Sequence, residues 1–132
     1  MMHRDPENEG LLEQAFKTGS GLIAFSPLAQ GLLTDRYLGG IPSDSRAARD
    51  FSLKASSITP ELQDKLNKLN ALAAERGQTL AQMALAWVLR DSMVTSVIVG
   101  ASSIEQLDNN LLSIRNTRFS DEEIELINVL TR

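Results

Sequence analysis

The feature that most constrains this chain is the stretch 95–110, which passes from an apolar segment through a glycine into a polar helix start. Residues 97–99 (Val-Ile-Val) are all β-branched, which is typical of a strand covered on both faces. Gly100 permits a tight turn after that strand. A helix that follows directly offers unpaired backbone N–H groups and a positive dipole end, both of which favour anions. The stretch therefore predicts a strand, a turn and a helix with a candidate phosphate site.

The start of that helix has two candidate caps. Ser102 is followed three residues later by Glu105, and Ser103 by Gln106, so either serine can form a capping box. Gln106 and Asn110 are four residues apart and share one helix face. Capped turns between strands and helices are common, so the spacing alone favours a helix that packs on a sheet and binds nothing.

A second apolar strand is predicted at residues 22–26, and Pro27 ends it because proline lacks the N–H that a ladder needs. Residues 28–34 follow as a loop with a short helical turn. Ser26 and Gln30 place polar side chains at the exit of this strand. Two interpretations stay open at this point, namely ordinary turn chemistry and the edge of a ligand site.

Two helices are predicted between the strands. Thr59-Pro60-Glu61 is a typical helix start, and Gly77 ends that helix. Thr79 caps the next helix, whose apolar stripe (Leu80, Met83, Ala84, Trp87, Val88) makes Trp87 a core residue. A further helix is expected over residues 104–115, and Ser120 with Glu123 marks the cap of a last one. Residues 11–17 have helical spacing, whereas residues 1–9 are expected to be a loop or a frayed end.

Composition limits the function classes. The chain has 132 residues, which fits one domain, and its net charge of −4 argues against a general nucleic-acid surface. It has no cysteine, which excludes disulfides, thiolate metal sites and cysteine nucleophiles. His3, the only histidine, lies in a polar segment and is interpreted as solvated. No apolar run reaches membrane-spanning length and no signal-peptide core is present, so we expect a cytoplasmic protein with no membrane contact.

The number of strands is too small for a complete domain. Strands that alternate with helices imply parallel pairing through right-handed crossovers. Only two apolar strands are visible, and an exposed apolar edge invites aggregation. We therefore expect further strands to flank them. The long irregular segment 35–57, which carries Arg46 and Arg49, is of a kind that often has a function.

One alternative is a helix-turn-helix motif that begins at residues 78–88. The acidic net charge argues against it. A strand follows where a recognition helix is required. Nucleic acid is therefore not an expected partner.

Four segments, in this order, resemble the C-terminal part of the aldo-keto reductase family: GLIAFSPLAQGLL (21–33), GIPSDSR (40–46), RGQTLAQMALAWVLR (76–90) and GASSIEQLDNN (100–110). Within the family, the resemblance is to the subgroup of bacterial glyceraldehyde 3-phosphate reductases, which is related to the β subunits of voltage-gated potassium channels. The resemblance covers essentially the whole chain from about residue 8.

The resemblance implies a fold. The family is a (β/α)₈ TIM barrel with its active site at the carboxyl ends of the strands. Such a barrel needs about 250 residues, so residues 1–132 would be roughly the last two fifths of one. Strand 22–26 would be the seventh and strand 95–99 the eighth. The fold class is therefore α/β, as a partial aldo-keto reductase domain with the last two strands and their helices.

The resemblance also implies a cofactor, NADP(H), and residues that bind it. The exit of the seventh strand and the loop after it would hold the pyrophosphate, and the turn after the eighth strand would hold the adenosine 2′-phosphate and the adenine. The residues at matching positions are Ser26, Pro27, Leu28, Ala29, Gln30, Gly31, Arg36, Arg46, Gly100, Ser102, Gln106, Asn109 and Asn110. The resemblance thus makes the turn at Gly100 a phosphate site, in contrast to the spacing alone.

This chain departs from the family at one position. The family usually has Glu-Asn where this chain has Asn109-Asn110. A neutral amide still accepts a hydrogen bond from the adenine amino group, so we expect weakened binding rather than lost binding. The family's catalytic Asp, Tyr, Lys and His belong to earlier strands. Neither Tyr37 nor His3 matches them, so this chain is expected to hold no catalytic residue.

Two functions remain at this stage. The first is the NADP(H)-binding C-terminal part of a reductase that converts aldehydes or ketones to alcohols, inactive in isolation and with a small-molecule carbonyl substrate in the complete enzyme. The second is a non-enzymatic remnant that dimerises or binds a partner protein through its open sheet edges. A homo-oligomer is compatible with both, and no metal ligand set is recognised.

Overall fold

The computed structural model describes residues 1–43 and 53–131. Its described elements run in the order α1 (Asp5–Asn8), α2 (Leu11–Lys17), β1 (Leu22–Phe25), three 3₁₀ turns, α3 (Pro60–Glu75), α4 (Leu80–Leu89), β2 (Val94–Ile98), α5 (Ile104–Leu111), η4 (Leu112–Arg115) and α6 (Asp121–Thr131). The 3₁₀ turns are η1 (Ala29–Gly31), η2 (Asp35–Tyr37) and η3 (Ala55–Ser57). Each predicted helix is present, and both strands begin or end within one residue of the predicted bounds.

The two strands form a parallel sheet, as the alternation of strands and helices predicted. Phe25 pairs with Ile98 at the carboxyl end, and the register is interrupted between Leu22 and Ile23. Thr95 packs closely over Gly21, where an added Cβ would come within 2.6 Å of the threonine hydroxyl. Glycine at this position therefore permits the close approach of the two backbones.

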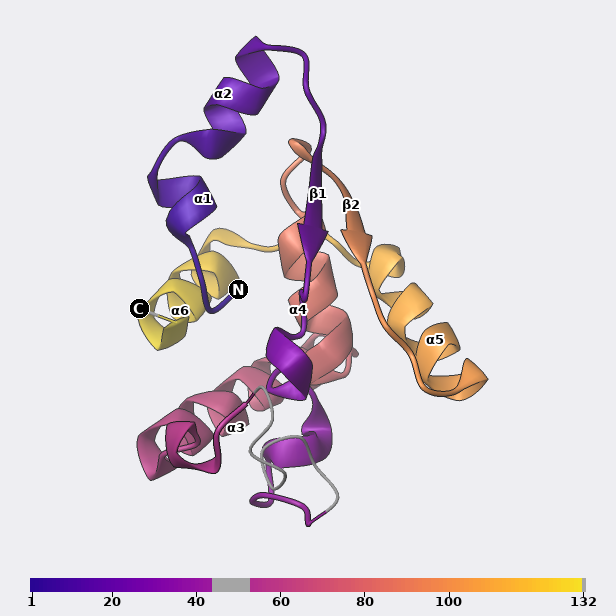
Figure 1. The fold of residues 1–132 in the computed structure, drawn as a ribbon. Helices are drawn as coiled ribbons and strands as arrows, with labels where there is room; N and C mark the ends of the chain where they lie inside the picture. The colour runs from indigo at the N-terminus through magenta and orange to yellow at the C-terminus, as the bar shows by residue number, and fades with distance from the viewer. Residues whose placement is uncertain (44–52, 132) are drawn as a thin grey trace.

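Helix α4 is the centre of the fold. It lies behind the two strands in Figure 1 and contacts β2, α3, α5 and η4. All residues from Leu80 to Trp87 are buried, so this helix is buried around its whole circumference and not only along the expected apolar stripe. The interpretation of Trp87 as a core residue is confirmed, because its side chain is fully buried.

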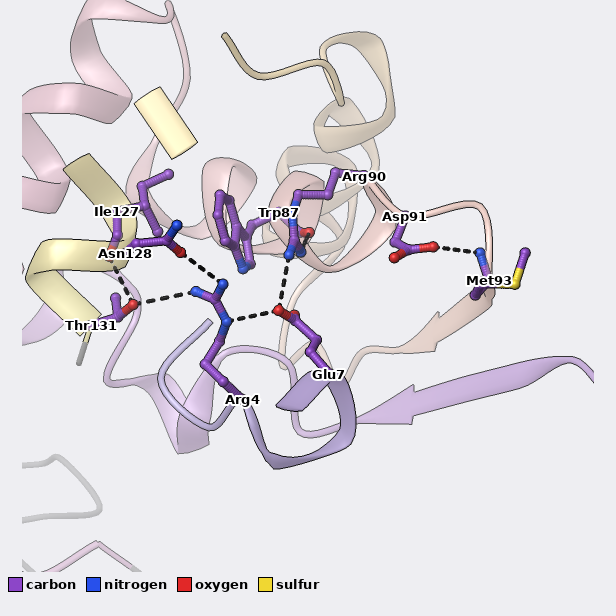
Figure 2. A network of polar contacts seen from close by, with 9 residues as sticks. All are labelled: Arg4, Glu7, Trp87, Arg90, Asp91, Met93, Ile127, Asn128 and Thr131. Carbon is purple, nitrogen blue, oxygen red and sulfur yellow. Dashed lines mark hydrogen bonds and ion pairs between the residues drawn. The ribbon is translucent and has the colours of Figure 1, made fainter. Parts of the chain in front are cut away.

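Residues 1–9 differ from the expectation of a frayed end. Arg4 donates to Glu7 (2.9 Å) and to Asn128 (2.8 Å), and Glu7 also accepts from Arg90 (3.1 Å). The guanidinium carbons of Arg4 and Arg90 lie 4.8 and 3.7 Å from the centroid of the Trp87 ring. Figure 2 shows this N-terminal clamp joining the first residues to α4 and α6. Long-range polar contacts therefore order residues 1–9, for which the local sequence predicted a loop or a frayed end.

The strands are covered on only one face. The expectation of strands buried on both faces is wrong for the described residues, since Ile23, Phe25 and Ile98 are 62%, 79% and 60% exposed. No element of the described ranges packs in front of the strands in Figure 1. In the same ranges, no helix is long and apolar enough to span a membrane.

Candidate functional site

The loop after β1 has an unusual backbone. Ser26, Ala29 and Gln30 have positive φ angles of 50°, 47° and 62°, and Gly31 follows at 96°. Within the described part of the chain, the non-glycine residues with a positive φ are these three, Ser26, Ala29 and Gln30. Each such residue costs about 1–3 kcal/mol, and clusters of them are typical of ligand-binding loops.

The turn after β2 resolves the choice between the two caps. Ser103 is the N-cap of α5, because its hydroxyl accepts from the backbone N–H of Gln106 at 3.1 Å. The Gln106 side chain does not return to Ser103. Its Oε1 instead accepts from the Ser102 N–H at 2.8 Å and from the Ser102 hydroxyl at 3.0 Å. Ser102 therefore has two hydrogen-bond donors held at one point beside the helix N-terminus.

A cleft of about 620 Å³ lies between the two strand exits and is called the strand-exit cleft here. One wall is the loop after β1, and the other is the turn after β2. Phe25 and Ile98, the paired last residues of the strands, line its apolar part. Its remaining lining is Ser26, Pro27, Leu28, Gln30, Gly31, Thr34, Arg36, Tyr37, Val99, Gly100, Ala101, Ser102 and Gln106.

A second hollow of about 490 Å³, called the amide hollow here, adjoins this cleft. The two share Leu28, Thr34, Arg36 and Gln106 as lining residues, so they form a continuous groove. The amide hollow is further lined by Asp35, Pro42, Ala81, Asn109 and Asn110. A long ligand with an anionic centre and a polar ring at one end therefore has matching surfaces along this groove.

Arg36 is the one basic residue that lines the groove within the described part of the chain, and it borders both hollows. It lies in η2, whose N-cap Thr34 accepts from the Arg36 N–H at 3.3 Å and donates its hydroxyl to the Gly31 carbonyl at 2.6 Å. Thr34 thereby connects the loop after β1 to η2, the turn that carries Arg36. A guanidinium in this position suits bidentate contact with a phosphate.

The amide side chains of α5 have a fixed arrangement. Asn109 Oδ1 accepts from Gln82 Nε2 at 2.8 Å, and the same nitrogen donates to the Asn109 carbonyl at 3.0 Å. Asn110 is 3% exposed, and its Nδ2 has no partner among the described residues. Gln82 therefore holds the side chain of Asn109, whose Oδ1 accepts one hydrogen bond here and has a second lone pair.

The structure brings together nearly all residues that the sequence assigned to a cofactor. Ser26, Pro27, Leu28, Gln30, Gly31, Arg36, Gly100, Ser102, Gln106, Asn109 and Asn110 line the groove. Ala29 lines neither part, although its left-handed backbone shapes the loop. Arg46 lies outside the described residues.

Sequence reasoning missed several lining residues, among them Thr34, Tyr37 and Ala81. Thr34 had a local signal, since a threonine before Asp-Arg-Tyr is a good N-cap. Tyr37 is 1% exposed, and Ala81 belongs to the buried helix α4. No local pattern reveals that a buried residue borders a groove between distant segments.

Comparisons with known proteins agree with this geometry. The aldo/keto reductase family profile matches residues 1–132. The chain is 47% identical to the L-glyceraldehyde 3-phosphate reductase of Escherichia coli O157:H7 and 46% identical to that of strain K12. Both matches cover 96% of this chain and 38% of the relative. The chain thus spans about two fifths of the length of these curated relatives.

A solved structure shares the fold. A thermostable aldo-keto reductase, crystallised in a complex with the inhibitor epalrestat, superimposes with a TM-score of 0.65 at 29% identity. The match covers 97% of this chain and 36% of that one. Because the family profile matches the chain from its first residue to its last, this protein belongs to the aldo/keto reductase family.

Proposed function

We propose that this chain is the NADP(H)-binding, C-terminal part of an aldo-keto reductase that reduces aldehydes or ketones to alcohols. In this proposal β1 and β2 are the seventh and eighth strands of a (β/α)₈ barrel. The observation that carries it is the groove at the carboxyl ends of two parallel strands, where ligands bind in such barrels. The relatives of which the chain spans 38% are named as reductases of L-glyceraldehyde 3-phosphate, which is a small aldehyde.

The residues of the groove fit the chemical parts of NADP(H). The pyrophosphate would lie against the loop from Ser26 to Gly31, whose cluster of left-handed residues is typical of ligand-binding loops. The adenosine 2′-phosphate would lie between Arg36 and the turn at Ser102. The two Ser102 donors now meet Gln106 Oε1, and a phosphate oxygen accepts from the same donors once that side chain turns aside.

The base would lie in the amide hollow beside Asn109 and Asn110. When bound, the reduced nicotinamide supplies the hydride for the carbonyl carbon. The contribution of this chain is to hold the dinucleotide and to exclude water with the apolar side chains of Phe25 and Ile98. The residue that protonates the carbonyl oxygen belongs to earlier strands by resemblance, so the isolated chain is expected to be inactive.

A titration of the 132-residue chain with NADPH, followed by nicotinamide fluorescence and thermal unfolding, tests the proposal. Saturable binding with a raised Tm is the expected result. Arg36→Met is expected to weaken NADPH binding about 10-fold or more, because a hydrogen bond to a charged group contributes about 1.5–3 kcal/mol. The same variant should affect NADH less, since NADH lacks the 2′-phosphate.

Matched variants separate the site from general stability. Ser102→Ala removes a hydroxyl donor of the groove, whereas Ser103→Ala removes the cap of α5. Ser102→Ala should weaken NADPH binding, and Ser103→Ala should lower Tm instead. Arg115→Met removes an exposed arginine outside the groove and should leave NADPH affinity unchanged. A folded chain that binds no NADPH at millimolar concentration contradicts the proposal.

A non-enzymatic, self-associating module is the second candidate, and the open face of the sheet favours it. Ile23, Phe25 and Ile98 form a contiguous exposed apolar surface there. This function predicts a discrete dimer in sedimentation velocity whose stability does not change with NADPH. A monomer that is stabilised by NADPH excludes it in favour of the reductase part.

A further inference from the structure

Helix α3 is connected to the turn that carries Arg36 through the side chain of Gln63. Gln63 lies near the start of α3 and is half-buried. Its Nε2 donates to the carbonyl of Tyr37 at 3.1 Å and to that of Leu38 at 3.3 Å. A carbonyl can only accept and an amide nitrogen carries two hydrogens, so the nitrogen of this amide must point toward η2. Among the described residues that line the two hollows, none belongs to α3, so this contact acts from outside the groove.

The turn that receives these two bonds is short and depends on contacts from elsewhere. η2 has three residues, and the Leu38 N–H donates to the Asp35 carbonyl at 3.2 Å across it. Hydrogen bonds of a 3₁₀ turn have poorer geometry than those of an α-helix, so they hold the turn weakly. The last carbonyls of a helical turn lack partners inside the turn. Helix α3 supplies one for them through Gln63.

Contacts on both sides of Arg36 therefore hold its backbone. Before it, the Thr34 hydroxyl accepts from the Arg36 N–H at 3.3 Å. After it, Gln63 holds two carbonyls, and the Tyr37 side chain is buried in the core at 1% exposure. Arg36 itself is exposed and borders both hollows. A held backbone beneath an accessible guanidinium reduces the conformational entropy that is lost when the arginine binds an anion.

We propose that Gln63 is a positioning residue for Arg36, which ties the turn that carries this arginine to α3 and thereby strengthens the contact of the guanidinium with the 2′-phosphate. Gln63 lines neither hollow and acts only through Arg36. This inference rests on the proposed binding of NADP(H) in the groove. The effect of Gln63 on affinity is then specific to the dinucleotide with the 2′-phosphate, and it requires the arginine.

The test is a double-mutant cycle on dinucleotide affinity, measured with the 132-residue chain by nicotinamide fluorescence. Gln63→Met removes both donors and keeps nearly the same shape. It is expected to weaken NADPH binding about 5-fold and NADH binding less than about twofold, within the range of one or two neutral hydrogen bonds. In the Arg36→Met background the same substitution should change NADPH affinity by less than about twofold, because no guanidinium is left to position.

The outcomes separate this inference from the proposed function. An equal loss of NADPH affinity with and without the arginine overturns the inference but leaves the proposed function intact. An equal loss for NADPH and NADH, or no loss at all, does the same. A folded chain without substitutions that binds no NADPH overturns both. Gln63→Leu also lacks the donors, should give the same pattern, and takes the place of Gln63→Met if that variant does not fold.

Two control variants separate positioning from general stability. Asn67→Met places the same side chain at an exposed position one turn further along α3 and should leave both affinities unchanged. Ser120→Ala removes the hydroxyl that accepts from the Glu123 N–H at 3.2 Å at the start of α6, outside the groove. It should lower the Tm and leave the ratio of NADPH to NADH affinity at the wild-type value. A merely structural role of Gln63 would give this same result, which overturns the inference.

Discussion

The two faces of the small sheet differ in how completely they are covered. Ala24 and Val97, which are paired in register, are half-buried, and β2 packs against α4. Ile23, Phe25 and Ile98 alternate with them along the strands, so they belong to the opposite face, and they are at least 60% exposed. The same two strands therefore supply a packed layer on one side and an apolar surface on the other. A β-branched and aromatic surface of this kind is what a further layer of strands would cover.

The helical side of the molecule has, by contrast, a closely packed core around Trp87. Trp87 is fully buried, with Phe119 edge-on at 5.2 Å and the guanidinium groups of Arg4 and Arg90 over its ring. Arg76, with its side chain 4% exposed, pairs with Glu123 at 2.6 Å and stacks 3.8 Å from the Phe119 ring. The difference teaches that the helices enclose a core beside the groove, whereas the sheet has one apolar face that no described residue covers.

The largest expected effect comes from the buried centre of the helical layer. Trp87→Ala should destabilise the chain by about 3–5 kcal/mol, because it leaves a cavity and removes the ring that the guanidinium groups of Arg4 and Arg90 contact. Urea unfolding followed by circular dichroism measures this loss. Trp87→Phe keeps most of the volume and should cost clearly less. A cost for Trp87→Ala near 1 kcal/mol would contradict a closely packed core around Trp87.

A smaller effect is expected at the N-terminal clamp. Glu7 Oε2 accepts from both Arg4 and Arg90, so Glu7→Gln removes the charge that both guanidinium groups face. Because the groups are partly solvated, the expected cost is about 1 kcal/mol. The control is Glu13→Gln, which breaks an exposed pair with Lys17 and should cost less than about 0.5 kcal/mol. Equal costs would show that the clamp contributes no more than a surface pair.

The smallest effect on stability is expected on the open face of the sheet. Ile23→Thr keeps a β-branched residue at a 62% exposed position and should change the unfolding free energy by less than about 0.5 kcal/mol. Val97→Thr on the covered face should cost about 1 kcal/mol, since it buries a hydroxyl. Sedimentation velocity should show less self-association for Ile23→Thr alone. A large cost for Ile23→Thr would mean that this face is covered in solution.

Much of the local structure could be predicted because its causes lie within a few residues. Thr79 and Gln82 form the predicted capping box, and Ser120 and Glu123 form another. The polar residues after each strand were assigned to one cofactor site by the family resemblance. That prediction placed Ser26 and Ser102 along one groove, as the structure has them.

The features that the sequence did not predict depend on residues that lie far apart in the chain. Gln82 was assigned to the cap of α4, and nothing local indicated that its nitrogen also holds Asn109, 27 residues away. Likewise, Arg4 lies in a polar segment with weak helical propensity, and its guanidinium is held by Asn128, Glu7 and the Trp87 ring.

The sequence by itself determined where helices and strands begin and end, because capping, proline and glycine geometry and apolar periodicity act over one or two turns. It also determined the family, since four motifs occur in the right order. Only the tertiary structure decided which strand face is covered, which arginines surround Trp87 and that Gln82 holds Asn109. These depend on which distant groups come within about 3–4 Å, the range of hydrogen bonds and packing contacts.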